Sequence, residues 1–132
     1  MVEKLVALAL GFAGAVTAHA APAATQDFEH VWSCELRPGK TLDDARAAAR
    51  SWLLAARSMS NGERLQVVIR YPIVVSDSEK RFDFVVRAPS LAAWGAFYDG
   101  YHDGTPVADA DLEFAEVAGC SGSTMWESIG VQ

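Results

Sequence analysis

Two histidines carry the most versatile acid–base chemistry in the sequence. His30 and His102 are the histidines that lie outside the first twenty residues. An imidazole titrates near neutral pH and can act as a general acid or base. His30 and His102 are therefore the catalytic candidates. The alternative for His102 is a solvated residue at the end of a helix, because Asp103 and a glycine follow it.

Aromatic side chains are the second group that could form a site. Trp32 and Trp126 fall in segments that we expect to be neighbouring strands, and Trp94 and Tyr98 fall in an expected helix. Large aromatic side chains supply most of the contact area in pockets for small apolar ligands. Trp32, Trp94, Tyr98 and Trp126 are therefore the ligand-binding candidates. The alternative is that the tryptophans belong to the hydrophobic core.

Acidic residues gather in the last third of the chain. Residues 88–132 contain seven Asp and Glu and no Lys or Arg. Calcium takes about six to eight oxygen ligands, so Asp99, Asp103, Asp109 and Asp111 suggest a calcium site. The spacing of an EF-hand loop is absent. The alternative is a solvated acidic face that keeps the protein soluble, and on this reading we expect no metal and no cofactor.

The first twenty residues have the pattern of a secretory signal peptide. A charged start is followed by an uncharged stretch over 5–16 and by an Ala-x-Ala sequence that ends at Ala20. Such a stretch spans about 18 Å as a helix, short of the roughly 30 Å core of a bilayer. We expect cleavage after Ala20, with Ala23 as the alternative, and a periplasmic or secreted bacterial protein. The predicted organisation is a signal peptide over 1–20, a flexible N-terminus over 21–27 and one α+β domain over 28–132.

Cys34 and Cys120 are the only cysteines of the chain. In an oxidising compartment, an even number of cysteines predicts a disulfide. Their wide separation lacks the CxxC spacing of a zinc site. The pattern therefore favours a Cys34–Cys120 disulfide, with two free buried thiols as the alternative.

Composition excludes several classes of protein. The chain has 132 residues and a formal charge of −6, and 51% of its residues are hydrophobic. A negative balance disfavours binding to nucleic acid, which depends on clustered Lys and Arg. After the leader, no hydrophobic run is long enough to span a membrane. The motifs GxSxG, HExxH and GxGxxG and the P-loop motif are also absent.

Hydrophobic periodicity predicts the elements that must position these side chains. The predicted strands are residues 28–36, 65–75, 81–88 and 123–131. A helix should begin after Thr41, which forms a capping pair with Asp44, and stop at Asn61-Gly62. A second helix should begin after Ser90 and end before Gly104. A further helical piece covers 109–117.

The order β-α-β-β-α-β predicts a ferredoxin-like α+β fold, a four-stranded antiparallel sheet with two main helices on one face. In this plan the fourth strand lies antiparallel beside the first. Cys34 lies late in the first strand, and Cys120 immediately precedes the predicted fourth strand. The topology therefore brings the two cysteines together, which supports both the fold and the disulfide.

The order of elements, the chain length and the aromatic second helix resemble the dimeric α/β-barrel superfamily, in a small exported version of unassigned activity. The resemblance covers residues 27–131 and concerns architecture. It implies two ferredoxin-like subunits packed sheet to sheet, and so a homodimer through the open sheet face. Some members degrade haem or open oxygenated rings with His and Trp between helix and sheet, and the chain is similar in having Trp94 and His102.

Three functions follow from these observations. The first is a non-enzymatic exported domain that binds a small apolar ligand or a partner. The second is a small enzyme of the dimeric α/β-barrel kind, similar to a monooxygenase. The third is a structural subunit of an envelope assembly. We favour the first, because the sequence contains none of the catalytic motifs searched for.

Overall fold

A computed structural model describes residues 28–73 and 80–131 of the chain. The predicted signal peptide over 1–20 and the predicted N-terminal segment over 21–27 lie outside these residues. No helix within the described ranges is both long and apolar enough to cross a membrane.

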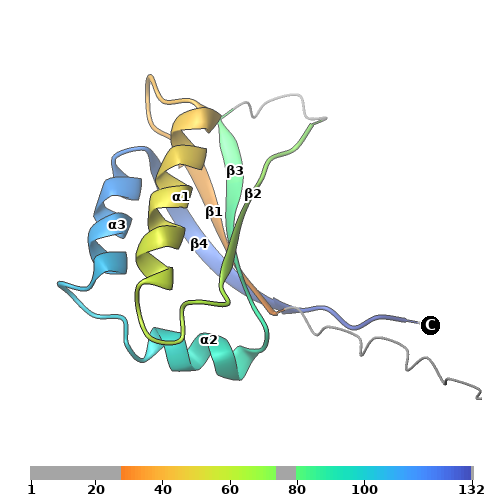
Figure 1. The fold of residues 1–132 in the computed structure, drawn as a ribbon. Helices are drawn as coiled ribbons and strands as arrows, with labels where there is room; N and C mark the ends of the chain where they lie inside the picture. The colour runs from red at the N-terminus through yellow and green to blue at the C-terminus, as the bar shows by residue number, and fades with distance from the viewer. Residues whose placement is uncertain (1–27, 74–79, 132) are drawn as a thin grey trace, which may run out of the picture.

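The described residues form a four-stranded sheet with helices on one face (Figure 1). The elements are β1 (Phe28–Leu36), α1 (Leu42–Arg57), β2 (Gln66–Arg70), β3 (Arg81–Ala88), α2 (Leu91–Tyr98), α3 (Pro106–Ala115) and β4 (Ala118–Glu127). The strand order is β2-β3-β1-β4, and every neighbouring pair is antiparallel. This is the ferredoxin-like arrangement, so the predicted fold class is confirmed. α1 and α3 lie side by side against the sheet, and α2 runs crosswise near one end.

The predicted bounds of β1 and β3 agree with the structure, whereas those of β2 were wrong. β2 ends at Arg70 instead of continuing to position 75, and positions 74 and 75 lie outside the described residues. Pro72 has no N–H to donate to a strand ladder, so a strand ends readily before it. β2 is also an edge strand of the sheet, the position where proline is tolerated.

α1 begins where its capping residues predicted. The Thr41 side chain accepts from the backbone N–H of Asp44, and the Asp44 carboxylate accepts from the backbone N–H of Thr41 at 2.8 Å. This donation to the charged form holds the pKa of Asp44 below its usual value. The helix ends at Arg57, and Asn61 then adopts a left-handed conformation (φ 65°) that turns the chain toward β2.

The elements after α2 begin earlier than predicted. α3 starts at Pro106, because Thr105 caps it and a proline fits the first helical turn, where no N–H is needed. β4 runs from Ala118 to Glu127 instead of 123–131, so Cys120 lies within the strand. The start of β4 is rich in Gly, Ser and Ala, which have weak strand propensity, and pairing with β1 decides its structure.

The two faces of the sheet differ in what covers them. Alternate residues of β1, including Phe28 and Cys34, pack with the three helices in one hydrophobic core. Val31 of β1 and Val85 of β3 pair on the opposite face and are outside that core cluster, although both are buried. We call the side that packs on the helices the helix face, and the side that carries Val31 and Val85 the open face.

Candidate functional site

A cavity of about 480 Å³ lies between the helix face of the sheet and the helices. Its aromatic lining includes Trp32, Trp52, Phe84, Trp94, Tyr98 and Tyr101. The volume lies in the range of about 300–1,000 Å³ that is typical of ligand pockets. The site therefore has the size and the apolar character expected of a small-molecule site.

The aromatic rings that line the cavity hold one another in place. The Trp32 and Trp94 rings meet edge to face, with centroids 6.3 Å apart. Trp94 also packs on Tyr98, with centroids 5.6 Å apart, and Tyr98 stacks on Tyr101 at 5.5 Å. Trp94 is buried, whereas Tyr98 is 52% exposed. The lining thus runs from the core to the surface, and three predicted ligand-binding residues, Trp32, Trp94 and Tyr98, meet in it.

Among the described residues, Asp111 is the carboxylate that lines the cavity, and each of its two oxygens accepts a hydrogen bond. The Trp52 indole N–H donates to Oδ1 of Asp111 at 2.7 Å, and the Tyr101 hydroxyl donates to Oδ2. Burial, together with the hydrogen bond to Asp111, raises the pKa of Tyr101. Tyr101 therefore stays a neutral phenol that donates to the carboxylate. The three residues connect α1, α3 and the segment after α2.

Among the residues that the structure describes, Arg37 is the one cation that lines the same cavity. Arg37 follows the last residue of β1, and its backbone N–H donates to the carbonyl oxygen of Val117 at 2.9 Å. Its side-chain Nε donates to the carbonyl oxygen of Ala115 at 2.5 Å. These bonds tie the arginine to the end of α3.

His30 lies on the helix face, behind the cavity wall. Its ring stacks on Trp32 with centroids 3.7 Å apart and meets Trp94 edge to face at 5.5 Å. Within the described ranges, neither ring nitrogen has a hydrogen-bond partner. Burial lowers the pKa of His30, because the charged imidazolium loses hydration, so the ring is neutral at neutral pH. His30 contacts two lining indoles without lining the cavity itself.

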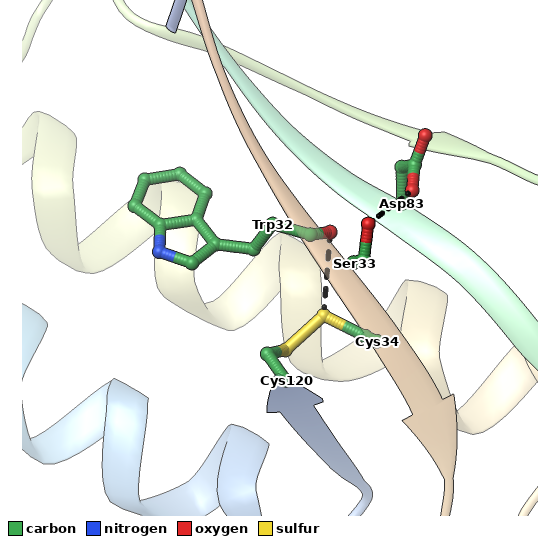
Figure 2. Close-up of a disulfide and its surroundings, with 5 residues drawn as sticks. All are labelled: Trp32, Ser33, Cys34, Asp83 and Cys120. Atoms are coloured by element: carbon green, nitrogen blue, oxygen red, sulfur yellow. Dashed lines mark hydrogen bonds between the residues drawn. A yellow bond between two sulfur atoms is a disulfide. The ribbon is translucent and has the colours of Figure 1, made fainter. Parts of the chain in front are cut away.

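The predicted disulfide is present and joins β1 to β4 beside the cavity (Figure 2). Cys34 pairs with Cys120 in the antiparallel ladder, just after a β-bulge between Ser33 and Cys34. Cys34 is buried, and Cys120 lines the cavity. The cross-link therefore fixes one wall of the cavity to the strand that carries Trp32.

Two candidates from the sequence lie away from this cavity. Trp126 pairs with Glu29 on the open face, where its indole N–H donates to Thr124 at 2.9 Å. Trp32 and Trp126 thus lie on opposite faces of the sheet. His102 is exposed between α2 and α3, with Nδ1 3.1 Å from the carbonyl oxygen of Asp103.

The four aspartates of the calcium hypothesis do not form one cluster. Asp111 is bound by Trp52 and Tyr101, while Asp99, Asp103 and Asp109 are exposed. Among the residues that the structure describes, no three His, Cys, Asp or Glu side chains are placed to hold a metal ion. The placement of the aspartates therefore favours a solvated acidic surface over a calcium site.

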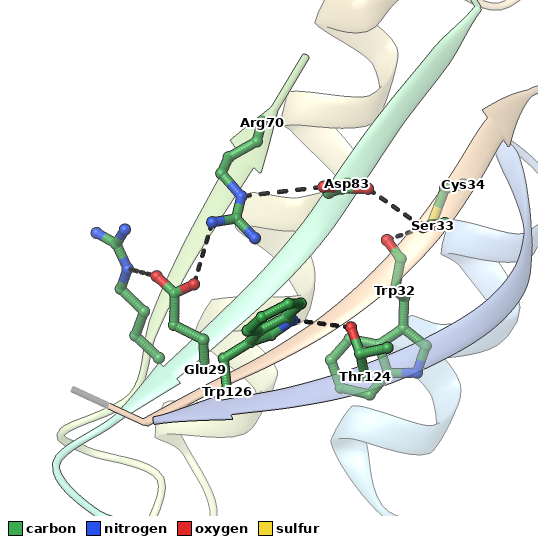
Figure 3. Close-up of polar contacts among 9 residues, drawn as sticks. Glu29, Trp32, Ser33, Cys34, Arg70, Asp83, Thr124 and Trp126 are labelled. Atoms are coloured by element: carbon green, nitrogen blue, oxygen red, sulfur yellow. Dashed lines mark hydrogen bonds and ion pairs between the residues drawn. The ribbon is translucent and has the colours of Figure 1, made fainter. Parts of the chain in front are cut away.

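The open face carries a row of charged side chains instead of helices (Figure 3). The Glu29 carboxylate accepts from Arg70 at 3.1 Å and from Arg87 at 2.8 Å. Ser33 donates to Asp83 at 3.3 Å. The exposed Trp126 side chain lies beside this row, next to Glu29 (Figure 3). The open face is thus partly charged and partly apolar.

Sequence reasoning missed Arg37, Trp52 and Tyr101 as lining residues of the cavity. Trp52 and Tyr101 line the cavity and also contact Asp111. The relevant contacts join residues 59 positions apart for Trp52–Asp111 and 78 apart for Arg37–Ala115. No local pattern signals contacts at such separations.

Comparisons with known proteins find two solved structures with a weak likeness to the chain. No family model matches the chain, and no curated protein sequence matches it. A conserved protein of unknown function from Bacteroides thetaiotaomicron, described as a possible oxidoreductase, is 8% identical and has a TM-score of 0.48; the match covers 80% of this chain and 100% of that one. A dimeric protein of unknown function with a ferredoxin-like fold, from Bacteroides fragilis, is 10% identical with a TM-score of 0.41, over 77% of this chain and 94% of that one. The strand order itself defines this chain as a small ferredoxin-like α+β protein.

Proposed function

We propose that the protein is an exported, non-enzymatic domain that binds a small, largely apolar ligand in the aromatic cavity. The observation that carries the proposal is the cavity of about 480 Å³, whose lining includes Trp32, Trp94 and Tyr98. Aromatic walls provide large contact areas and stacking partners for a flat apolar molecule. Ligand pockets are typically apolar with a few polar groups, as here with Asp111 and Arg37.

The polar groups of the cavity favour binding over turnover. Asp111 is held by two donors, and Arg37 is tied to the end of α3. A general base must reach a substrate proton within hydrogen-bond distance, and neither nitrogen of His30 lines the cavity. These hydrogen bonds hold Asp111 and Arg37 in place at the cavity wall and leave the aromatic surface for contact with a ligand.

The disulfide supports export as part of the same proposal. Disulfides form and persist in oxidising compartments, and Cys34–Cys120 is the pair formed in this structure. The signal-peptide pattern of residues 1–20 points the same way. Both features suit a protein of the periplasm or the external medium.

Titration calorimetry with naphthaleneethanol, a flat neutral alcohol, tests ligand binding. We expect saturable binding that Trp32→Ala weakens about tenfold, because the aromatic contact and its buried area are lost. The matched control is Trp126→Ala, whose indole lies on the open face and should leave binding unchanged. Absence of binding by the wild type, or equal losses in both variants, would contradict the proposal.

We also propose that a second copy of the chain covers the open face. Trp126 is 58% exposed beside the open face, and the chain after β4 exposes Ile129 and Val131 by 76% and 97%. This segment continues beyond the sheet (Figure 1), and its exposed apolar side chains are available for another subunit to pack on. Exposed apolar surface of this kind is typical of subunit interfaces.

Light scattering after gel filtration tests the dimer. We expect a dimer for the wild type and a monomer for Trp126→Glu, because a carboxylate at the interface would be buried without a partner. Leu112→Glu is the control, since Leu112 is 70% exposed but lies on α3, on the other side of the sheet. A monomeric wild type, or dissociation of the Leu112→Glu variant alone, would refute the proposed interface.

A further inference from the structure

We infer that the ligand of the aromatic cavity carries a carboxylate or a similar anionic group, which binds to Arg37. The inference rests on the proposed binding function and names the chemical class of the ligand: an acid with a flat apolar body. Three features of the site lead to it: the unused hydrogen-bond donors of Arg37, the hydrogen bonds that Asp111 already accepts, and the aromatic side chains of the cavity walls.

Arg37 is held with most of its donors unused. A guanidinium has five N–H donors, and the one on Nε is bound to the carbonyl oxygen of Ala115. Within the described part of the chain, its terminal nitrogens have no hydrogen bond, and Arg37 is in no ion pair. By contrast, Arg70 and Arg87 on the open face are both paired with Glu29. Planar forked donors match the two oxygens of a carboxylate, which makes Arg37 suited to bind one.

The negative group of the cavity, Asp111, already has a hydrogen-bond partner on each of its oxygens. Asp111 and Ala115 lie one helical turn apart on α3, so Asp111 and the Arg37 anchor share one side of that helix. Trp52 and Tyr101 each donate to one oxygen of Asp111. Among the described residues, Arg37 is therefore the charged lining group with unused hydrogen-bond donors, and an anion on the ligand would accept from them.

The aromatic walls of the cavity indicate the shape and polarity of the rest of the ligand. Trp32, Trp94 and Tyr98 present ring surfaces to the cavity, and these favour a flat apolar body over a strongly hydrated one. An acid of this kind places its body among the rings and its charged end beside Arg37. Because the guanidinium is exposed, the anion can keep part of its hydration while it binds.

Three probes with the same naphthalene body test the inference by titration calorimetry: naphthaleneacetate, naphthaleneethanol and naphthaleneethylamine. We expect wild-type protein to bind the acid about tenfold more tightly than the alcohol, because hydrogen bonds between charged groups are stronger than neutral ones. Arg37→Gln should bring the acid to within about threefold of the alcohol when both are measured on the same variant, so the ratio of the two affinities reports the loss of the guanidinium. Arg37→Lys keeps the positive charge but lacks the planar, forked donors of the guanidinium, so it should retain part of the preference for the acid over the alcohol.

The exposed Arg64, which does not line the cavity, provides the control variant Arg64→Gln, and it should behave as the wild type. Circular dichroism and thermal unfolding check that Arg37→Gln is folded. Equal affinity of the wild type for the acid and the alcohol would overturn the inference and leave the proposed function standing. Tighter binding of the amine would overturn it too and point to Asp111. If neither the acid nor the alcohol binds, the proposed function itself fails.

Discussion

The double variant C34S/C120S is expected to lose about 4–5 kcal/mol of unfolding free energy relative to the wild type. The disulfide joins residues 86 positions apart, so it removes a large amount of conformational entropy from the unfolded chain. The predicted domain over 28–132 is small, and small domains bury a limited apolar area. We therefore expect the disulfide to supply a large share of the total stability, which urea unfolding followed by circular dichroism measures.

Reduction of the wild-type protein separates the cross-link from the effect of the serines. Cys34 is buried at 4% exposure, so a serine there would also bury a hydroxyl group. Wild-type protein in dithiothreitol has no such hydroxyl and should show most of the same loss. If the unfolding free energy of the reduced protein were within about 1 kcal/mol of that of the oxidised protein, the disulfide would not be a major source of stability.

Gly62→Ala is the second substitution with a large expected effect, a loss of about 3 kcal/mol, at the upper end of overpacking costs. An added Cβ at Gly62 would overlap the carbonyl oxygen of Ala56, which is backbone and cannot move away as a side chain can. The chain makes this close approach where α1 ends and turns toward β2. Thermal and urea unfolding of the variant measure the loss.

Gly95→Ala provides the matched control within a helix. Gly95 lies in α2, and an added Cβ there would meet no atom within 4 Å. Because alanine is the better helix former, this variant should gain up to about 1 kcal/mol. If Gly62→Ala and Gly95→Ala lost equal amounts of unfolding free energy, the close approach of Gly62 to Ala56 would not explain the effect.

The strands and helix starts with clear local signals were predictable from the sequence. The alternation of aromatic and branched residues in β1 and β3 gave the correct bounds, and Thr41 and Ser90 cap the helices as predicted. The start of β4 was not predictable, because its glycines and serines acquire strand structure only through pairing with β1. The pairing of Cys34 with Cys120 was nevertheless predictable, because the predicted topology places the last strand beside the first.

The candidate site was only partly predictable, for a different reason. The sequence identified Trp32, Trp94 and Tyr98 as ligand-binding candidates, and the structure brings them into one cavity. It also grouped Trp126 with them, because neighbouring strands alone do not reveal which face a side chain occupies. Register decides the face, and Trp126 pairs with Glu29 on the open side. The place of Arg37 in the site was not predictable, because it depends on a contact with Ala115, 78 positions further along the chain.

The indole N–H signals in a two-dimensional NMR spectrum test the central claim, that the aromatic cavity is the ligand site, most directly. The four tryptophans divide into Trp32, Trp52 and Trp94, which line the cavity, and Trp126, which lies on the open face. On titration with naphthaleneacetate, the account predicts that the three cavity signals shift together with one affinity while the Trp126 signal stays in place. A shift confined to Trp126, or no shift in any of the four, would contradict it.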